Sequence, residues 1–345
     1  MKHFTSLIVF FCLCLMPLGA EAANNGEVIV YNWSDYIPED VLRDFTKETG
    51  IKVVYTTYES NEAMYAKVKM LKGAGYDVVC PSTYVLEQMI SEGLVQKLDH
   101  SKIPNMGNVE PRLMDLPFDK GNLFSMPYMW GNYGIIVNTR LAKAPVTSWQ
   151  DLLRPEFKNR IMLYDDPRMT FGMALLATGS NPNSRDEAEI KAAFEFLQKV
   201  RPNVRVFDVS AASRSMVAEE ASIGAIWNGD GQLAMYENPD LSFIYPREGV
   251  VVWLDNFAIT SGSDNVDNAH KFINFMLRPE VAIRCLEEYG YSTANRAAFD
   301  IMDDELKNNR VLNPTPEDLK NSAIVTGVGE AQSIYNKYWE RLLAN

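Results

Sequence analysis

The apolar and polar positions of this chain alternate between two patterns. Short runs rich in Val, Ile and Tyr at residues 27–31 and 51–58 are typical of β-strands. Residues 38–50 begin with Pro and end with Gly, and residues 60–73 begin with a Ser that can cap a helix, so both segments predict helices. Strands that alternate with helices of this length indicate βαβ units and a mostly parallel sheet.

The same alternation returns in the second half of the chain. Residues 133–138 and 160–166 predict strands, and residues 186–200 predict a helix because their apolar residues lie three and four positions apart. Residues 249–260 form a long apolar run that is interrupted by Asp255, and we interpret this run as a strand. Two α/β halves without a low-complexity linker predict two lobes.

The absence of a flexible linker also predicts that the chain passes between the lobes more than once. We expect these crossings near residues 132–134 and near residues 255–256. The predicted division is residues 23–133 and 256–305 in lobe 1, and residues 134–255 and 306–345 in lobe 2.

The first 22 residues have the features of a secretory signal peptide. Lys2 gives a basic start, residues 7–16 form an unbroken apolar run, and residues 20–22 (AEA) form a small-x-small cleavage site. The apolar run is too short to span a bilayer of about 30 Å. No Cys follows it at the spacing that lipid attachment requires, so we expect a soluble exported protein that is cut near Ala22.

Composition narrows the classes of partner. The net charge of −12 predicts a surface that repels nucleic acid and anionic lipid and attracts cations, so we expect no nucleic-acid partner. Only Cys80 and Cys285 remain after processing. They could pair in an oxidising compartment if they lay close together, but we interpret them as two buried small side chains.

The motifs of common enzymes are missing from the sequence. Only His100 and His270 remain after processing, and there is no G-x-S-x-G, no G-x-x-x-x-G-K-[ST] and no G-x-G-x-x-G. No Cys pair has zinc spacing, so we expect no metal and no cofactor. An exported hydrolase that uses two carboxylates remains an alternative, since Asp and Glu are plentiful.

Trp is followed closely by Asp at three places in the chain, namely Trp33 to Asp35, Trp227 to Asp230, and Trp253 to Asp255. The first two pairs come at the end of a predicted strand, and ligands of open parallel sheets bind outside the carboxyl ends of the strands. Similar strand-end positions are held by Ser82, Tyr84 and Asp166.

Aromatic rings beside carboxylates favour one class of ligand. The face of an indole attracts an ammonium group by roughly 0.5–2 kcal/mol, and a neighbouring carboxylate adds a charge-assisted hydrogen bond. Rings alone would suit a neutral sugar or an apolar ligand, and acids alone would suit a hard metal ion. Rings and acids together indicate an organic cation with methylene segments.

Structural roles provide an alternative for most of these residues. Asp35 and Asp166 could cap the helices that follow them, and Ser82 and Tyr84 could be turn and helix-start residues. Each Trp could be a core residue, and we expect Trp130, Trp149 and Trp339 to fill space in the core or at the surface. Asp255 is the hardest to explain in this way, because a lone buried Asp in an apolar strand is costly without a partner.

The chain resembles the periplasmic polyamine-binding proteins of ABC importers, the spermidine/putrescine type. The resemblance begins at residues 31–67 (YNWSDYIPEDVLRDFTKETGIKVVYTTYESNEAMYAK). It continues in order through YDVVCPSTY, MPYMWGNYGIIVN, SWQDLLRPEFKNRI, IWNGDG, WLDNFAI and YGYSTAN. It implies an α/β, two-lobed periplasmic-binding-protein fold (venus-flytrap, type II) with mixed, mostly parallel sheets. It also implies a monomer that closes on a polyamine and delivers it to an ABC permease.

The resemblance also implies roles for individual residues. Aromatic walls correspond to Trp33, Trp227, Trp253 and Tyr291. Asp255 corresponds to a carboxylate that grips one amine. Further polar contacts correspond to Asp35, Ser82, Tyr84 and Asp166, with Ser34 and Tyr36 in the first binding loop and Asp230 after the second Trp.

The departures from the family concern selectivity. Met169 stands where the family usually has Glu, and Val325 stands where spermidine binders have Gln. Asp35 and Asp230 are similar to the putrescine-preferring branch, whereas Tyr84 and Asp166 are similar to the spermidine branch. The loss of the Glu removes a candidate partner for one nitrogen, so we lean to putrescine and leave spermidine open. A receptor of the same fold for another organic cation or a metal ion is the alternative, although Tyr289 and Tyr291 have no neighbouring His for iron.

Overall fold

The computed structural model describes residues 26–208 and 212–344, and the predicted signal peptide lies outside them. The strands are β1 Glu27–Trp33, β2 Lys52–Tyr58, β3 Val78–Val79, β4 Ser125–Asn138, β5 Ile161–Leu163, β6 Val204–Phe207, β7 Ile223–Trp227, β8 Leu241–Ile244, β9 Val251–Ile259, β10 Ser292–Thr293 and β11 Ala323–Ile324. The α-helices are α1 Glu39–Thr49, α2 Asn61–Met70, α3 Thr83–Ser91, α4 Pro167–Ala177, α5 Glu187–Val200, α6 Ala212–Val217, α7 Asn228–Glu237, α8 Val266–Met276, α9 Pro279–Tyr289, α10 Arg296–Ile301, α11 Asp304–Asn308 and α12 Gln332–Leu343.

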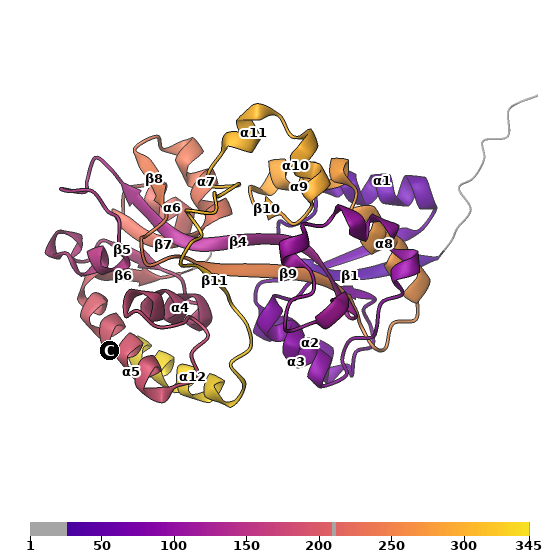
Figure 1. Ribbon diagram of the computed structural model, residues 1–345, viewed down its shortest axis with the longest axis horizontal. Helices are drawn as coiled ribbons and strands as arrows, with labels where there is room; N and C mark the ends of the chain where they lie inside the picture. Colours follow the sequence, from indigo (N-terminus) through magenta and orange to yellow (C-terminus); the bar gives the residue numbers. More distant parts are fainter. Residues whose placement is uncertain (1–25, 209–211, 345) are drawn as a thin grey trace, which may run out of the picture.

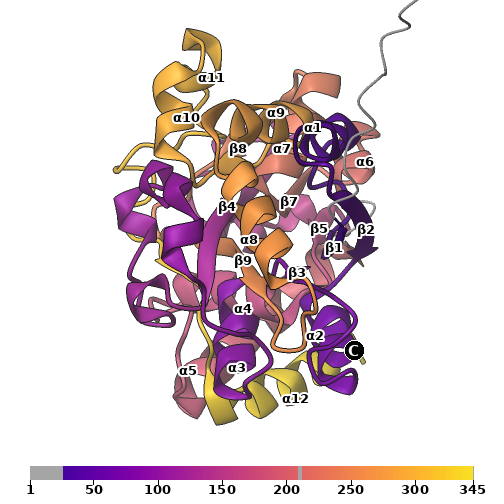
Figure 2. The ribbon, with the colours of Figure 1, turned by 90° about the vertical axis from the view of Figure 1, so that its right-hand side faces the viewer.

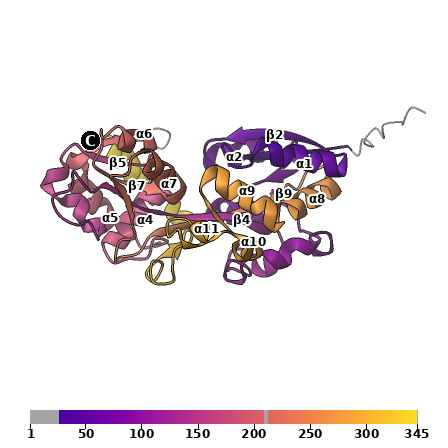
Figure 3. The same ribbon diagram turned by 90° about the horizontal axis from the view of Figure 1, so that it is seen from above.

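The fold has two lobes that share a mixed sheet. The main path of strands is β2-β1-β3-β9-β4-β7-β5-β6, with β8 and β10 paired to β4 and β11 paired to β9. β4 and β9 lie side by side at the centre and extend from one lobe into the other (Figures 1 and 3). Residues 132–134 lie in β4 and residues 255–256 lie in β9, while the predicted crossings and lobe boundaries remain a proposal.

The pairing directions explain why the sheet is mixed. β1 pairs in parallel with β2 and β3, and β5 pairs in parallel with β6 and β7, as the βαβ pattern predicts. Among the described strands, every antiparallel pair involves β4 or β9. Apart from the parallel β11–β9 pair, the parallel parts are the outer strands of each lobe, and the antiparallel part is the connection between them.

Helices cover the strands of the first lobe from two sides. Figure 2 shows this lobe facing the viewer, with α1 above and α2 and α3 below the strands β1–β3. α1 ends at Gly50, whose left-handed φ of 70° lets its N–H bond to the carbonyl oxygen of Thr46. α2 begins at Ser60, whose hydroxyl accepts the N–H of Ala63, as the sequence predicts.

β4 is longer than the sequence indicates. We expect a strand over residues 133–138, but β4 begins at Ser125 and all 14 of its residues are buried. Pro127 and Gly131 break the apolar pattern of its first half, and the register with β9 shifts between Pro127 and Met129. Tertiary burial between the two lobes therefore determines this strand rather than local propensity.

Of the two places that the sequence left open for Trp130, Trp149 and Trp339, the structure shows the core. Trp149 is completely buried, and Trp130 and Trp339 are almost so. Cys80 and Cys285 are free and buried, which agrees with the interpretation that they are small core side chains. Within residues 26–208 and 212–344, no helix is both long and apolar enough to cross a membrane.

Gly131 gives a test of the packing between β4 and β9. A Cβ at this position would lie 2.2 Å from Oδ1 of Asn228 and 2.4 Å from Cζ2 of Trp253. Gly131→Ala is therefore expected to lower the free energy of unfolding by about 1–3 kcal/mol, measured by urea denaturation. Gly107→Ala is the control, because its added Cβ would meet no atom within 4 Å. Equal losses in the two variants would contradict the packing argument.

Candidate ligand-binding site

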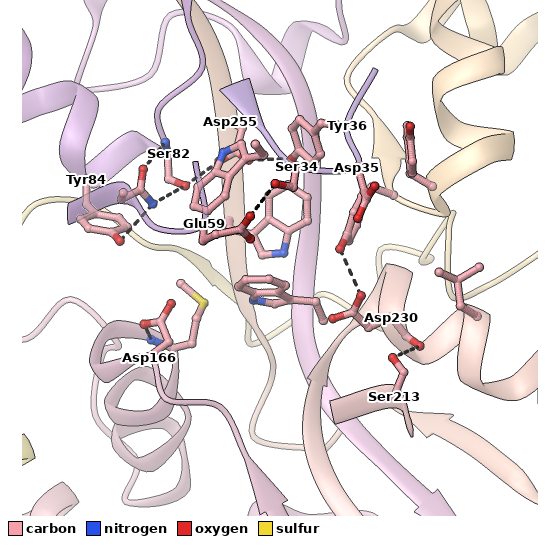
Figure 4. Close-up of a pocket in the computed structure, with 18 residues that line it drawn as sticks. Ser34, Asp35, Tyr36, Glu59, Ser82, Tyr84, Asp166, Ser213, Asp230 and Asp255 are labelled. Atoms are coloured by element: carbon pink, nitrogen blue, oxygen red, sulfur yellow. Dashed lines mark hydrogen bonds between the residues drawn. The ribbon is translucent and has the colours of Figure 1, made fainter. Parts of the chain in front are cut away.

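One pocket of about 420 Å³ holds all twelve residues that the sequence nominates. Figure 4 shows Ser34, Asp35, Tyr36, Ser82, Tyr84 and Asp255 on one side and Asp166 and Asp230 on the other. The indoles of Trp33, Trp227 and Trp253 line the same space. The pocket is also lined by six residues that the sequence analysis did not nominate, which are Glu59, Asn61, Met169, Ser213, Leu233 and Tyr289.

The carboxyl ends of parallel strands bring most of these side chains together, as the sequence predicts. Trp33 is the last residue of β1, and Trp227 is the last residue of β7. Ser82 and Asp166 precede α3 and α4, which follow β3 and β5. Asp230 lies in the first turn of α7, where α7 follows β7 directly.

Trp253 and Asp255 reach the pocket differently, from the middle of β9. Every residue of β9 is buried, and Asp255 is only 3% exposed. Its Oδ2 accepts a hydrogen bond from the Tyr36 hydroxyl at 2.6 Å, and its Oδ1 accepts one from the Ser82 hydroxyl at 2.5 Å. Two donors from different loops therefore satisfy the carboxylate that the apolar strand carries into the interior.

Burial controls the ionisation of Asp255. Desolvation raises the pKa of this carboxyl to about 7, although the hydrogen bonds from Ser82 and Tyr36 act to lower it. A cation bound next to Asp255 would favour the ionised form and would replace part of the lost hydration. The site therefore favours the binding of a cation.

Asp230 has a similar arrangement on the other side of the pocket. Its carboxylate accepts hydrogen bonds from the hydroxyls of Tyr164 and, at 3.3 Å, Tyr291. Burial raises the pKa of Asp230, whereas the two tyrosine hydroxyls lower it. The pocket therefore places a second carboxylate across from Asp255.

Asp166 combines a structural role with a place in the pocket. It is the N-cap of α4, where its Oδ1 accepts the N–H of Met169 at 2.9 Å. Burial raises the pKa of Asp166 to about 6. The capping interpretation is thus correct for Asp166, although the same side chain also lines the cavity.

The capping interpretation is wrong for Asp35. α1 has Pro38 at its N-cap and no side-chain cap bond. Asp35 instead lies exposed at the rim with a left-handed φ of 51°. The neighbouring Ser34 donates its hydroxyl proton to Glu59 at 2.6 Å, which brings another carboxylate to this rim.

The three indoles are held in place by aromatic and polar neighbours. Trp33 donates its Nε1–H to the Cys80 carbonyl oxygen at 3.1 Å. Trp253 meets Tyr291 edge-on with ring centroids 5.4 Å apart, and Trp227 meets Tyr164 edge-on at 4.8 Å. Fixed rings of this kind give a cation and its methylene groups flat surfaces to contact.

Two more residues of the pocket follow the end of a parallel strand and could have been predicted on that basis. Glu59 and Asn61 follow the end of β2, which is parallel to β1. Tyr164, which follows β5 directly, does not line the pocket but donates its hydroxyl proton to Asp230. Leu233 and Tyr289 lie inside helices, where the sequence offers no comparable signal.

The donor set of the pocket suits an organic cation better than a metal ion. In the described ranges, no group of three or more His, Cys, Asp and Glu side chains is arranged to hold a metal. Asp255 and Asp230 instead share the pocket with three indole rings, and each accepts hydrogen bonds from hydroxyl donors. This arrangement is able to bind separate positive charges that are joined by an apolar segment.

The fold and the pocket between its lobes define a two-lobed solute-binding protein. Residues 40–313 match the family of bacterial extracellular solute-binding proteins, and the chain belongs to this family. It is 42% identical to the spermidine/putrescine-binding periplasmic protein of Escherichia coli over 98% of this chain and 97% of that protein. It is 34% identical to the putrescine-binding periplasmic protein PotF of the same species, over 92% and 91%.

Solved structures show the same likeness. A spermidine/putrescine ABC transporter substrate-binding protein from Streptococcus pneumoniae has a TM-score of 0.83 and 35% identity, over 92% of this chain and 99% of that chain. A putative spermidine/putrescine ABC transporter protein from Listeria monocytogenes has a TM-score of 0.86 and 37% identity, over 92% and 98%. The expected two-lobed fold and family are thereby confirmed.

The raised pKa of Asp255 predicts a pH dependence of stability in the ligand-free protein. Between the ordinary pKa of 3.8 and about 7, the folded state keeps a proton on Asp255 that the unfolded state has lost. The stability that this proton gives is complete below about pH 4 and is lost as pH rises through 7. Asp255→Asn is therefore expected to gain stability relative to wild type between pH 5 and 8, measured by urea denaturation.

The control is Asp264→Asn, which removes the same charge from an exposed position. This variant is expected to follow the wild-type profile. A constant difference between Asp255→Asn and wild type across that pH range would show that burial does not raise the pKa of Asp255.

Proposed function

We propose that this protein captures a polyamine in the periplasm and delivers it to an ABC permease. The single observation that carries this proposal is the pocket in which Asp255 and Asp230, each satisfied by hydroxyl donors, lie among three indoles. A linear aliphatic chain with protonated ends matches this pattern. The names of the relatives support the same ligand class, since they are described as spermidine/putrescine-binding or putrescine-binding periplasmic proteins.

The cellular location is inferred from the N-terminal sequence and from the names of the relatives. The basic and apolar features of residues 1–22 support export and cleavage near Ala22. The relatives are periplasmic proteins. We therefore place the protein in the periplasm, where the acidic chain would attract polycations and raise their rate of association.

The proposed mechanism is capture without chemical change. Asp255 and Ser82 meet the ligand from one side, and Asp166 and Asp230 meet it from the other. A ligand that touches both sides stabilises the closed arrangement of the lobes over an open one. A binding protein of this kind returns its ligand unaltered, whereas a carboxylate-dependent hydrolase would not, and mass spectrometry of the incubated polyamine distinguishes the two.

Asp255→Asn is expected to weaken polyamine binding by about 2–5 kcal/mol, because the amine that Asp255 would bind then meets no negative charge there. Trp253→Leu removes a ring surface but no charge, so its loss is expected to be smaller. Isothermal titration calorimetry at pH 8 measures both, and circular dichroism checks the fold. Unchanged affinity in Asp255→Asn would reject its role, and the reverse ranking would count against an electrostatic anchor.

We further propose that putrescine is preferred over spermidine. Met169 is 3% exposed and presents its thioether to the pocket beside Asp166. Val325 is 1% exposed and does not line the pocket. An apolar wall here offers a third nitrogen no additional charged partner, whereas a diamine needs only Asp255 and Asp230.

Met169→Glu is expected to raise the affinity for spermidine relative to putrescine by about tenfold, since a carboxylate supplies a charge-assisted hydrogen bond to the third nitrogen. Met169→Gln is the matched control, with similar size and no charge, and is expected to change the ratio less. Competition calorimetry with both polyamines measures the ratio. A ratio that stays the same in Met169→Glu would show that this wall does not select ligand length.

A further inference from the structure

We propose that Asn61 is a positioning residue, whose side-chain amide fixes the Ser82 hydroxyl as a hydrogen-bond donor to Asp255. The inference rests on the proposed function, because it assigns a role within the same polyamine site. Asn61 is the first residue of α2 and is 5% exposed. Its neighbours in the sequence give no sign of this role.

The orientation of the Asn61 amide is determined by the backbone. The N–H of Ser82 can only donate, and it points to Oδ1 of Asn61 at 3.1 Å. The other end of the amide must therefore be the NH₂ group, and Nδ2 lies 3.0 Å from Oγ of Ser82. Asn61 thus holds Ser82 through both its main chain and its side chain.

This orientation dictates the direction of the Ser82 proton. Because Oγ accepts a hydrogen from Asn61, its own hydrogen has to point elsewhere, and Oδ1 of Asp255 lies 2.5 Å away. A serine hydroxyl is otherwise free to rotate between donor and acceptor positions. Asn61 removes this freedom, so that the carboxylate keeps its second donor before a ligand arrives.

Asn61 acts through its neighbours rather than on the ligand. Its second Nδ2 hydrogen is directed to the Tyr84 hydroxyl at 3.1 Å, so both amide hydrogens are committed within the protein. A cationic ligand needs acceptors, and the acceptor that gains from this arrangement is Asp255. Loss of Asn61 should therefore change the ionisation of Asp255 rather than remove a ligand contact.

The other titratable groups near Asp255 do not obscure its ionisation in a pH titration. Tyr36, Tyr58, Tyr291 and Cys80 surround the carboxylate, and burial raises the pKa of each well above its ordinary value. These four groups stay uncharged between pH 5 and 9. The more distant carboxyls that titrate in the pocket, Asp166 and Asp230, are common to wild type and variant.

The experiment is calorimetric titration with putrescine from pH 5 to 9, on wild type, Asn61→Ala, Ser82→Ala and the double variant. Asn61→Ala is expected to move the midpoint of the affinity profile upward by about one pH unit. The affinity is then about tenfold weaker below the midpoint and recovers at pH 9. In the Ser82→Ala background, Asn61→Ala is expected to cause no further shift, because the donor that it orients is gone.

Two further variants test whether a pH shift in Asn61→Ala arises from poor folding or from a disturbed start of α2. Asn61→Leu keeps the side-chain volume and is expected to show the same shift if Asn61→Ala folds poorly. Ser60→Ala removes the N-cap of α2, whose hydroxyl accepts the Ala63 N–H, and leaves Ser82 untouched. This variant is expected to lower the melting temperature while leaving the midpoint in place.

The possible results separate the two proposals. A loss of affinity in Asn61→Ala that is equal at all pH values, or a shift that persists in the Ser82→Ala background, would overturn the role of Asn61. Wild type that binds neither putrescine nor spermidine at any pH would overturn the proposed function itself. A pH midpoint that moves in Ser60→Ala as far as in Asn61→Ala would assign the effect to the start of α2.

Discussion

The binding pocket is organised around one buried carboxylate in the middle of an apolar strand. Asp255 lies on β9, which passes between the lobes, and its hydrogen bonds come from the loop after β1 and the start of α3. An uncompensated charge at this depth would cost several kcal/mol. The hydroxyls of Tyr36 and Ser82 reduce this cost, and a bound ammonium group would reduce it further. Much of the architecture around the pocket serves to keep these partners in place.

The other carboxylates repeat this arrangement with different supports. Asp230 is held by two tyrosine hydroxyls, and Asp166 is held by the N–H of Met169 at the start of α4. Each acid therefore uses part of its hydrogen-bonding capacity on the protein. The remaining oxygen lone pairs are available to a ligand, because neither hydroxyls nor backbone N–H groups neutralise the negative charge. No Lys or Arg is among the described residues that line the pocket, so none of these lining side chains competes with a cationic ligand, although the charge of Arg168 acts on Asp166 from outside this lining.

Much of the candidate site could be predicted from the sequence, because it follows strand ends and an unusual Asp. Trp33, Trp227 and Ser82 lie where the βαβ pattern places them, and Asp255 is conspicuous as the acid in an apolar run. The first half of β4 could not be predicted, because Pro127 and Gly131 obscure a strand that burial stabilises. The place of Asn61 after β2 could be predicted, but its role could not, since that role depends on contacts between α2 and the start of α3.

Gly131 has a consequence for how this receptor could change its ligand over evolution. The backbone of β4 presses so closely on the six-membered ring of Trp253 that no methyl group fits between them. The Trp253 indole therefore cannot move toward β4, and the depth of the pocket on this side is fixed. A longer or bulkier guest has to be accommodated at the opposite wall, where the first turns of α4 and α7 present Met169 and Asp230. Substitutions that retune ligand length should therefore accumulate in those two turns, while the ring and the glycine behind it change together or not at all.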